Sequence, residues 1–427
     1  MIVAIVLFVV FFALTFLGVP IFISLGVAAI AGFVAFGADA VSIIQASFTP
    51  MDSFGFMALP FFIMAGKLME IGGISSRLVG LAKVFVSRIR GGLAYTTILA
   101  CAFFAALSGS GVGTCSAIGS IMYPEMTESD YGEDFSAGLV ACAGGLGPII
   151  PPSTAMVTYG VLTGVSILSM FLSGIIAGVL IAVALFVVAN ILCRIKGFGT
   201  PKKSTLSRRA KLMKFVGALP ALGMPLIILG GIYFGIFTPT EASVVAVVYS
   251  LIVGLFIYKE LKFKDILKVA KSSAIATVMV MMVIGMSAAF SWIFTRAGLA
   301  TAFMNMMLTL CSTKAVFIII SMVVLLIFGV FMEGSCVMLL MAPLMHPVAV
   351  SFGINPVHYG LIFTIATTIG AMTPPVAMNI FTVCGITKLP IERVSRGIFP
   401  FTITSVVCLF IIAFWPQLVL FIPNLLK

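Results

Sequence analysis

Apolar residues run almost without interruption along the chain, and short polar segments divide them into blocks. Continuous blocks of the length that a bilayer requires lie at 2–17, 20–36, 53–70, 166–193, 215–236, 242–258, 272–295 and 397–423. Because ~20 apolar residues in a helix cross the hydrocarbon core, each block is predicted to be a membrane span. The first block has neither a basic start nor a small-residue cleavage site, so it is interpreted as a span rather than a signal peptide. The pattern predicts an all-α, polytopic membrane protein.

Two further blocks, at 92–126 and 314–347, are too long for one span. A single helix of ~35 residues would rise ~52 Å, against a hydrocarbon core of ~30 Å. Two half-helices would each reach ~22 Å and would turn inside the membrane. The sequences SGSG (108–111) and EGS (333–335) lie near the middle of these blocks and suit a tight turn. We therefore expect two re-entrant helical hairpins, with a glycine kink or a small-residue packing face as the alternative.

Two more blocks, at 134–163 and 356–386, contain paired prolines within GLGPIIPPS (145–153) and GAMTPPVAMN (370–379). Proline removes a helical donor and sterically blocks the preceding turn, so each pair is expected to unwind its span for several residues; a simple kink is the alternative. Carbonyls freed in this way must be buried in protein or line a hydrated cavity. The predicted helix-break residues are Pro151, Pro152, Pro374 and Pro375.

The order of these parts occurs twice. In each half a span is followed by an interfacial segment, a hairpin block, a broken span and an unbroken span. The spacing agrees, since Ser110 lies 41 residues before Pro151 and Ser335 lies 39 residues before Pro374. The first half is expected to begin outside and the second inside, so the repeat is inverted. Inverted repeats with interrupted helices at matching positions are typical of secondary transporters, whose sites lie near the bilayer midplane.

Composition and charge agree with this picture. The 427 residues are 62% apolar and 9% charged, whereas soluble domains are about 45–50% apolar and about 25% charged, so a soluble enzyme is excluded. Most of the 24 Lys and Arg residues lie between spans, at 67–90, 194–214, 259–271 and 388–396. The positive-inside rule makes these segments cytoplasmic, which places both termini outside and Trp292 and Trp415 near the outer interface. The basic residues form no groove with interleaved aromatics, so no nucleic acid is expected as a partner.

Each half should bring a hairpin tip beside unwound backbone, where carbonyl and hydroxyl oxygens converge away from water. Such oxygen clusters suit a small hard cation, and the C-terminal dipoles of half-helices favour Na⁺. The candidate ligands of a first sodium site are Ser108, Ser110, Gly145, Gly147 and Pro148. Those of a second site are Gly334, Ser335, Cys336, Gly370 and Thr373. Two or more Na⁺ ions, transported rather than permanently bound, are the only metal or cofactor that we expect.

The N-termini of the half-helices offer N–H groups and a positive dipole, which hold a carboxylate well. The candidate substrate-binding residues are Ser110, Ser153, Thr154, Ser335 and Asn379; the alternative is that their side chains pack between helices. Glu333 is a predicted intramembrane carboxylate, which is a costly placement. It is interpreted either as a cation ligand or proton carrier, or, as we favour, as a partner of Arg296 or Lys314 or part of a tip that reaches solvent.

Other chemistries lack their motifs. The chain holds no G-x-x-x-x-G-K-[ST] sequence for ATP, and no paired carboxylates or Ser/His dyad for catalysis, so no enzyme is expected. The eight cysteines are interpreted as small buried hydrophobes. His346 and His358 lie alone near loops, and surface or interface positions are expected for them. An ion channel is an alternative function, because two opposed re-entrant hairpins also line some pores; a stand-alone Na⁺/anion symporter is another.

Three motifs in this order, GGLGPIIPPS (144–153), GIFTPTEAS (235–243) and GAMTPPVAMN (370–379), resemble the large membrane subunit (M, or DctM-like) of tripartite ATP-independent periplasmic (TRAP) transporters. The resemblance covers nearly the whole chain. It implies an ion-transporter-superfamily fold with a scaffold and a mobile transport domain, and Na⁺-driven uptake of an organic acid by an elevator-type motion. It also implies a small four-helix membrane subunit, a periplasmic substrate-binding protein, and a place in the bacterial inner membrane with periplasmic termini. Family substrates include C4-dicarboxylates, sialic acid and other sugar acids, and no motif chooses among them.

The resemblance also implies a division of the chain. The expected scaffold parts are 1–70 and 164–296, the latter with a cytoplasmic basic loop at 194–214. The expected transport-domain parts are 92–163 and 314–386, each with one hairpin and one broken helix. Interfacial arms at 71–91 and 297–313 precede them, and a C-terminal span occupies 387–427.

Overall fold

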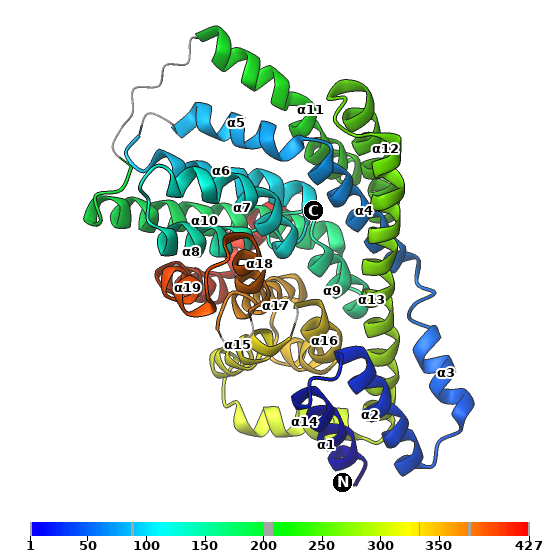
Figure 1. Cartoon of the computed structure of the whole chain (residues 1–427). Coiled ribbons are helices and arrows are strands. Elements are labelled where there is room, and N and C mark those ends of the chain that lie inside the picture. Colours follow the sequence, from blue (N-terminus) through cyan, green and yellow to red (C-terminus); the bar gives the residue numbers. More distant parts are fainter. Residues whose placement is uncertain (1, 87–88, 200–207, 333, 375–376, 426–427) are drawn as a thin grey trace.

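Figure 1 shows the computed structural model, which describes residues 2–86, 89–199, 208–332, 334–374 and 377–425. Within these ranges the chain consists of helices joined by short loops and contains no strand. Eight of the described helices are long and apolar enough to cross a bilayer. The all-α, polytopic fold expected from the sequence is confirmed.

The first half contains a row of helices before the first hairpin. These are α1 (Ile2–Phe16), α2 (Ile21–Phe36), α3 (Ala40–Phe48), the 3-10 turn η1 (Phe54–Met57), α4 (Ala58–Ile71) and the arm α5 (Ile74–Val86). The hairpin, the broken helix and the unbroken helix follow as α6 (Gly92–Ser108), α7 (Gly111–Thr127), α8 (Glu133–Gly144), α9 (Thr154–Thr163) and α10 (Ile167–Ile195). Two helices then connect the halves, α11 (Arg208–Tyr233) and α12 (Pro239–Ile252), which ends in the π-turn η2 (Val253–Ile257).

The second half repeats this order. Its elements are α13 (Phe263–Arg296), the arm α14 (Leu299–Leu310), α15 (Lys314–Phe331), α16 (Gly334–Ser351), α17 (Pro356–Gly370), α18 (Met378–Thr387), α19 (Ile391–Phe414) and α20 (Pro416–Leu425). In Figure 1 the arm α5 lies at the top of the molecule and the arm α14 at the bottom. The two arms therefore lie at opposite ends of the molecule, as an inverted repeat requires.

Both predicted hairpins are present. In the first, α6 and α7 meet at Gly109, whose left-handed conformation (φ 59°) is one that glycine adopts without strain. In the second, α15 ends at Phe331 and α16 begins at Gly334. The helices are 17 or 18 residues long, so each rises ~26 Å, somewhat less than the hydrocarbon core.

Both predicted helix breaks are present as well. The first separates α8 from α9 and contains Pro151 and Pro152, and the second separates α17 from α18 and contains Pro374. Pro375 lies outside the described residues. Since proline supplies no N–H and blocks the turn before it, the helix resumes only after each pair.

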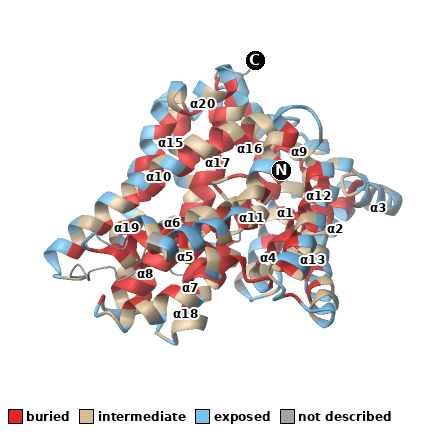
Figure 2. Cartoon of the chain, turned by 90° about the horizontal axis from the view of Figure 1, so that it is seen from above, coloured by how far each residue is buried: buried red, intermediate tan, exposed pale blue. Residues whose placement is uncertain are grey.

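The hairpins and broken helices of the two halves pack together. α9 contacts α16, α18 contacts α7 and α8, and α19 contacts α8 and α10. Ten of the 12 residues of α8 and 13 of the 15 residues of α17 are buried, so both helices are enclosed by their neighbours; in Figure 2 the buried residues are the red parts of the ribbon. A second group contains α2, α4, α12 and α13, which pack along one another.

Apolar stripes on the outside explain why the helices suit a bilayer. On α10, Val179, Val183, Val187 and Ile191 are between 48% and 57% exposed. Their spacing of four residues places them on one face of the helix. An exposed apolar face of this kind fits hydrocarbon chains.

Some expectations were wrong in detail. The last span is not one helix over 397–423, because it begins at Ile391 and ends at Phe414, and α20 follows separately. Pro416 explains the break, since a residue before proline is disfavoured in helical geometry. The helix α3 was not expected at all.

His358 is not at a surface, because it is 1% exposed and its Nε2 donates to Ile412 O (2.8 Å).

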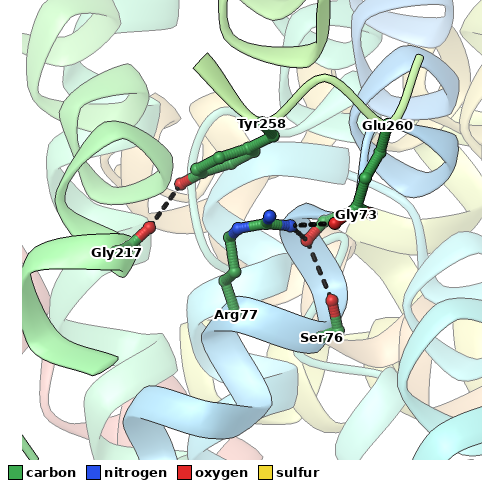
Figure 3. A network of polar contacts seen from close by, with 6 residues as sticks. All are labelled: Gly73, Ser76, Arg77, Gly217, Tyr258 and Glu260. Carbon is green, nitrogen blue, oxygen red and sulfur yellow. Dashed lines mark hydrogen bonds and ion pairs between the residues drawn. The ribbon is translucent and has the colours of Figure 1, made fainter. Parts of the chain in front are cut away.

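A polar network ties the arm α5 to the connecting helices (Figure 3). Arg77 donates to Glu260 Oε1 (2.6 Å) and to Gly73 O (2.7 Å), and its guanidinium stacks 3.8 Å from the centre of the Tyr258 ring. The Tyr258 hydroxyl donates to Gly217 O (2.8 Å). The start of the arm is thus fixed to α11 and to the turn that follows η2.

Candidate functional site

The first hairpin tip contacts the first helix break backbone to backbone. A Cβ atom at Gly109 would lie 2.5 Å from Pro152 O, and one at Gly147 would lie 2.3 Å from Ser110 O. Thr154 Oγ1 donates across the contact to Gly109 O (3.2 Å). Only glycine permits this approach, so the tip and the unwound segment are brought together as the sequence predicted.

Hydroxyl groups at this contact cap the half-helices. Ser110 Oγ accepts from Gly113 N (3.3 Å) at the start of α7, and Ser153 Oγ accepts from Met156 N (3.2 Å) at the start of α9. Ser153 is fully buried and also donates to Pro148 O (2.5 Å). Caps of this kind hold the N-termini of α7 and α9 in place.

The tip is braced by further hydroxyls. The hydroxyls of Ser108 and Thr114 hydrogen-bond to each other (2.9 Å), and Thr114 Oγ1 donates to Ser110 O (2.8 Å). The carbonyl of Ser110 is therefore held in a defined direction beside Gly147.

The second half makes a similar contact through other atoms. A Cβ atom at Gly370 would lie 2.6 Å from Gly329 Cα, so the end of α17 touches the end of α15 directly. Thr373 forms its hydrogen bonds within the break. Its hydroxyl donates to Ile369 O (2.7 Å), and its N–H donates to Gly370 O (2.9 Å). Asn379 links the halves, because its amide donates to Ala141 O (3.3 Å) of α8.

Both tips and both breaks meet around a small cavity of about 70 Å³, here called the central cavity. The predicted site residues on its wall are Ser110, Pro148, Thr154, Gly334, Ser335 and Asn379. Thr367 and Thr368, at the end of α17, also line it and were missed in the sequence. Paired threonines just before a helix break were the signal that would have found them.

A larger cavity of about 360 Å³, here called the inner cavity, shares Ser110, Val112, Thr154 and Ser335 with the central cavity and also includes Ser108. Its opposite wall is formed by α4 and α13. The charged residues on the lining are Lys67 and Glu70, in the last two turns of α4, and the sequence had indicated neither as a site residue. Lys67 Nζ donates to Ser272 O (2.8 Å), and Glu70 Oε1 accepts from Ser116 (3.3 Å) of the first hairpin.

Several predicted residues support the site without lining either cavity. These are Gly145, Gly147, Ser153, Cys336, Gly370 and Thr373. Gly145 packs close to Met372 of the second break, and Cys336 is buried. Glu333 lies outside the described residues. Among the described part of the chain, no group of three His, Cys, Asp or Glu residues is placed to hold a metal.

A third cavity, of about 970 Å³ and here called the outer cavity, lies farther along α13. Ala276 and Val280 of this helix line the inner cavity, whereas the stretch from Ile284 to Arg296 lines the outer one. On α9, Thr158 lines the inner cavity and Val161 lines the outer cavity. No described residue lines both cavities.

Comparison with known proteins agrees with this architecture. The family described as "Tripartite ATP-independent periplasmic transporter, DctM component" matches residues 8–418. The chain is 38% identical to the C4-dicarboxylate TRAP transporter large permease protein DctM of Pseudomonas aeruginosa, covering 94% of each chain. It is 33% identical to the sialic acid TRAP transporter large permease protein SiaM of Vibrio cholerae, covering 96% of each.

A further relative and a solved structure are also similar to this chain. The chain is 39% identical to the isethionate TRAP transporter permease protein DctMQ of Oleidesulfovibrio alaskensis, over 95% of this chain and 64% of that protein. The fold is similar to that of the Alcanivorax borkumensis YdaH transporter, described as having an unusual topology, with a TM-score of 0.55 and 13% identity over 85% of this chain and 86% of the other. The family match and the coverage of these relatives show that the chain is a member of the DctM family, the large permease component of TRAP transporters.

Proposed function

We propose that the chain is the large permease subunit of a Na⁺-coupled secondary transporter that imports an organic acid anion. The observation that supports this most directly is the meeting of both hairpin tips and both helix breaks around the central and inner cavities. Ser110, Thr154 and Ser335 line both spaces, so a cation in one and an anion in the other share a wall. Such a shared wall is the physical basis for coupling their binding.

The size and the lining of the central cavity support a Na⁺ site. Its described lining offers hydroxyl, amide and backbone oxygens and contains no carboxylate. Thr367 and Thr368 donate their hydroxyl protons to carbonyls of their own helix, Phe363 O (3.0 Å) and Thr364 O (2.7 Å), which leaves oxygen lone pairs for a cation. Unwound carbonyls and the C-terminal end of α17 add negative dipole. Two or more ions are proposed to travel with each substrate.

The inner cavity has the features of an anion site. The N-termini of α7 and α9 lie at its wall, at Ser110 and Thr154, and Lys67 supplies a positive charge from the opposite wall, where Glu70 also lies. The relatives named above act on C4-dicarboxylates, sialic acid and isethionate, all of which are organic anions. An organic acid anion is accordingly the proposed substrate.

Alternating access is favoured over a channel by the separate cavities. A channel requires a continuous pore, whereas the inner and outer cavities share no described lining residue. The walls of the inner cavity come from two groups of helices, α4 with α13 and the hairpins with α9. An elevator-type movement of the hairpins and α9 past α4 and α13 would carry the site from one side of the membrane to the other.

The family membership supports a set of partners and a location. We expect a small four-helix membrane subunit and a periplasmic binding protein that delivers the substrate, in the bacterial inner membrane. Because 21 of the 24 basic residues lie in the four segments assigned to the cytoplasm, both termini are expected in the periplasm.

The proposal is tested by uptake in proteoliposomes that contain the chain with its small subunit, with binding protein and labelled acid outside. Succinate, N-acetylneuraminate and isethionate form the test panel. Accumulation of at least one acid is expected under an inward Na⁺ gradient and not under a K⁺ gradient of the same size. Equal uptake in both gradients, or ionic conductance without accumulation, would contradict it.

A further inference from the structure

The outer cavity is built from both groups of helices. One wall consists of α3 and the C-terminal half of α13, and the other of the end of α9 and the middle of α16. Its volume of about 970 Å³ is at the upper end of the range of small-molecule sites. It is therefore large enough for a ligand of many atoms, well beyond a four-carbon acid.

A row of unbonded hydroxyls follows one face of α13 inside this cavity. Ser287, Ser291 and Thr295 are four residues apart, and all three line the space. Many helical hydroxyls elsewhere in the molecule bond the carbonyl four residues back, as those of Thr364 and Thr368 do. None of these three hydroxyls bonds a described residue, and that of Ser287, a residue that is 2% exposed, is buried without a partner. Such a row is available to a ligand that both donates and accepts hydrogen bonds.

A single positive charge stands at the end of the row. Arg296 lines the cavity and forms no ion pair within the part of the chain that the structure describes, and no carboxylate is present among the described lining residues. Its guanidinium carbon lies 6.0 Å from the centre of the Trp292 ring, which is itself stacked on Phe33 at 5.0 Å. The cation therefore lies beside a fixed aromatic surface, with its donors unused by protein carboxylates.

We propose that the outer cavity binds a polyhydroxylated monocarboxylate, that is, an acid of the sugar-acid class, before it reaches the inner cavity. Arg296 pairs with the carboxylate, and Ser287 and Ser291 exchange hydrogen bonds with the hydroxyl chain. A dicarboxylate fits less well, because its second charge finds no cation on the described lining. This inference rests on the proposed function and names the substrate class of that transport.

Tryptophan fluorescence provides a direct binding test. The chain contains two tryptophans, Trp292 and Trp415, so Trp415→Phe leaves Trp292 as the only reporter, in the cavity wall. Gluconate titrated into this purified full-length variant is expected to give a saturable change in emission. Succinate is expected to require at least tenfold higher concentration for the same change.

Matched variants assign the response to the proposed groups. Arg296→Gln in the Trp415→Phe background is expected to weaken gluconate binding at least tenfold, and Arg296→Lys to restore most of it. Lys314→Gln removes a cation from the start of α15 on the same predicted side and serves as the control, with no expected change. Replacing Ser287 and Ser291 with alanine is expected to abolish the preference for gluconate over acetate while leaving acetate binding unchanged.

The outcomes separate this inference from the proposed function. Na⁺-driven uptake of an acid without any Trp292 response to gluconate overturns the inference and leaves the proposed function standing. Equal affinities for succinate and gluconate overturn the substrate class. A saturable, Arg296-dependent response in a protein that shows no Na⁺-driven uptake supports the site and removes the proposed function.

Discussion

Thr367 and Thr368 place hydroxyl oxygens on the lining of the central cavity. Both side chains face the central cavity at the end of α17, where they stand beside Gly334 and Ser335 of the second tip. Valine has nearly the shape of threonine and lacks the oxygen, so the substitution removes a proposed cation ligand with little change in volume. The pair is therefore where sodium coupling is most directly tested.

Thr368→Val is expected to raise the Na⁺ concentration for half-maximal uptake about tenfold, which corresponds to ~1.4 kcal/mol. A sodium titration of uptake in proteoliposomes measures this. Thr404→Val removes a hydroxyl that likewise donates to a carbonyl four residues back, Pro400 O (2.8 Å), and that lines none of the three cavities, so it is the control. Identical sodium curves for the two variants would show that Thr368 does not bind the ion.

Lys67 provides a second test at this scale. Because it is one of the two charged residues on the lining of the inner cavity, Lys67→Gln is expected to raise the substrate KM about tenfold and to leave the sodium dependence unchanged. Lys264→Gln, at an exposed position near the start of α13, is the comparison, and initial uptake rates across substrate concentrations give both values. A fall in kcat at constant KM would instead assign Lys67 to movement rather than binding.

The sequence revealed some site residues and concealed others for a clear reason. Ser110, Thr154 and Ser335 stand beside glycines and prolines that interrupt apolar blocks, so they were visible locally. Lys67 lies at the end of a span, where a lysine is already explained by the positive-inside rule. Its approach to the hairpin depends on how α4 and α13 pack, which no local pattern shows.

Among the elements, hairpins and helix breaks were the most predictable because their causes are local. Proline pairs remove donors wherever they occur, and Gly109 permits a turn that other residues resist. The helix α3 was not predicted, because nine residues between two spans carry too little periodicity to separate a helix from a loop. The division of the last span by Pro416 was overlooked because the residues on both sides are apolar.

The arm α5 offers a test at the scale of elements. Arg77→Ala is expected to lower the thermal stability of the purified protein more than Glu260→Gln does. The glutamine variant loses one ion pair whose side chains are 27% and 45% exposed, worth about 0.2–1 kcal/mol. The alanine variant also loses the stacking on Tyr258 and the bond to Gly73 O.

Arg77→Lys separates these contributions, because it keeps the charge and loses the flat guanidinium that stacks on the ring. Its stability is expected to fall between those of the other two variants. If alanine and glutamine variants melt at the same temperature, the ring contact contributes nothing to holding the arm.

For the molecule as a whole, the movement of one helix group past the other is testable by cross-linking. Glu70 and Ser116 hydrogen-bond between α4 and the first hairpin. In a background without other reactive cysteines, a Glu70→Cys, Ser116→Cys pair bridged by Hg²⁺ is expected to stop uptake, and a reducing thiol to restore it.

The control pair joins α8 and α19, which pack against each other and lie outside the group of α2, α4, α12 and α13. Cys142 Sγ and Ser405 Oγ are 3.6 Å apart, on α8 and α19. Retaining Cys142 and introducing Ser405→Cys places a bridge between helices that are expected to move together, so uptake should persist. Full activity with the first pair bridged would rule out relative motion at α4.

The long helix α13 has an electrical consequence. Val280 and Ile284 line different cavities yet stand only four residues apart, ~6 Å along the helix axis. If water fills both cavities of the proposed transporter, a membrane voltage would drop mainly across this thin layer rather than across ~30 Å of lipid. Moving one elementary charge across this layer changes its electrical free energy by ~2.3 kcal/mol per 100 mV. Under the proposed coupling, two sodium ions with one monovalent acid would carry one net positive charge, so the resting potential would drive accumulation even where sodium concentrations are equal.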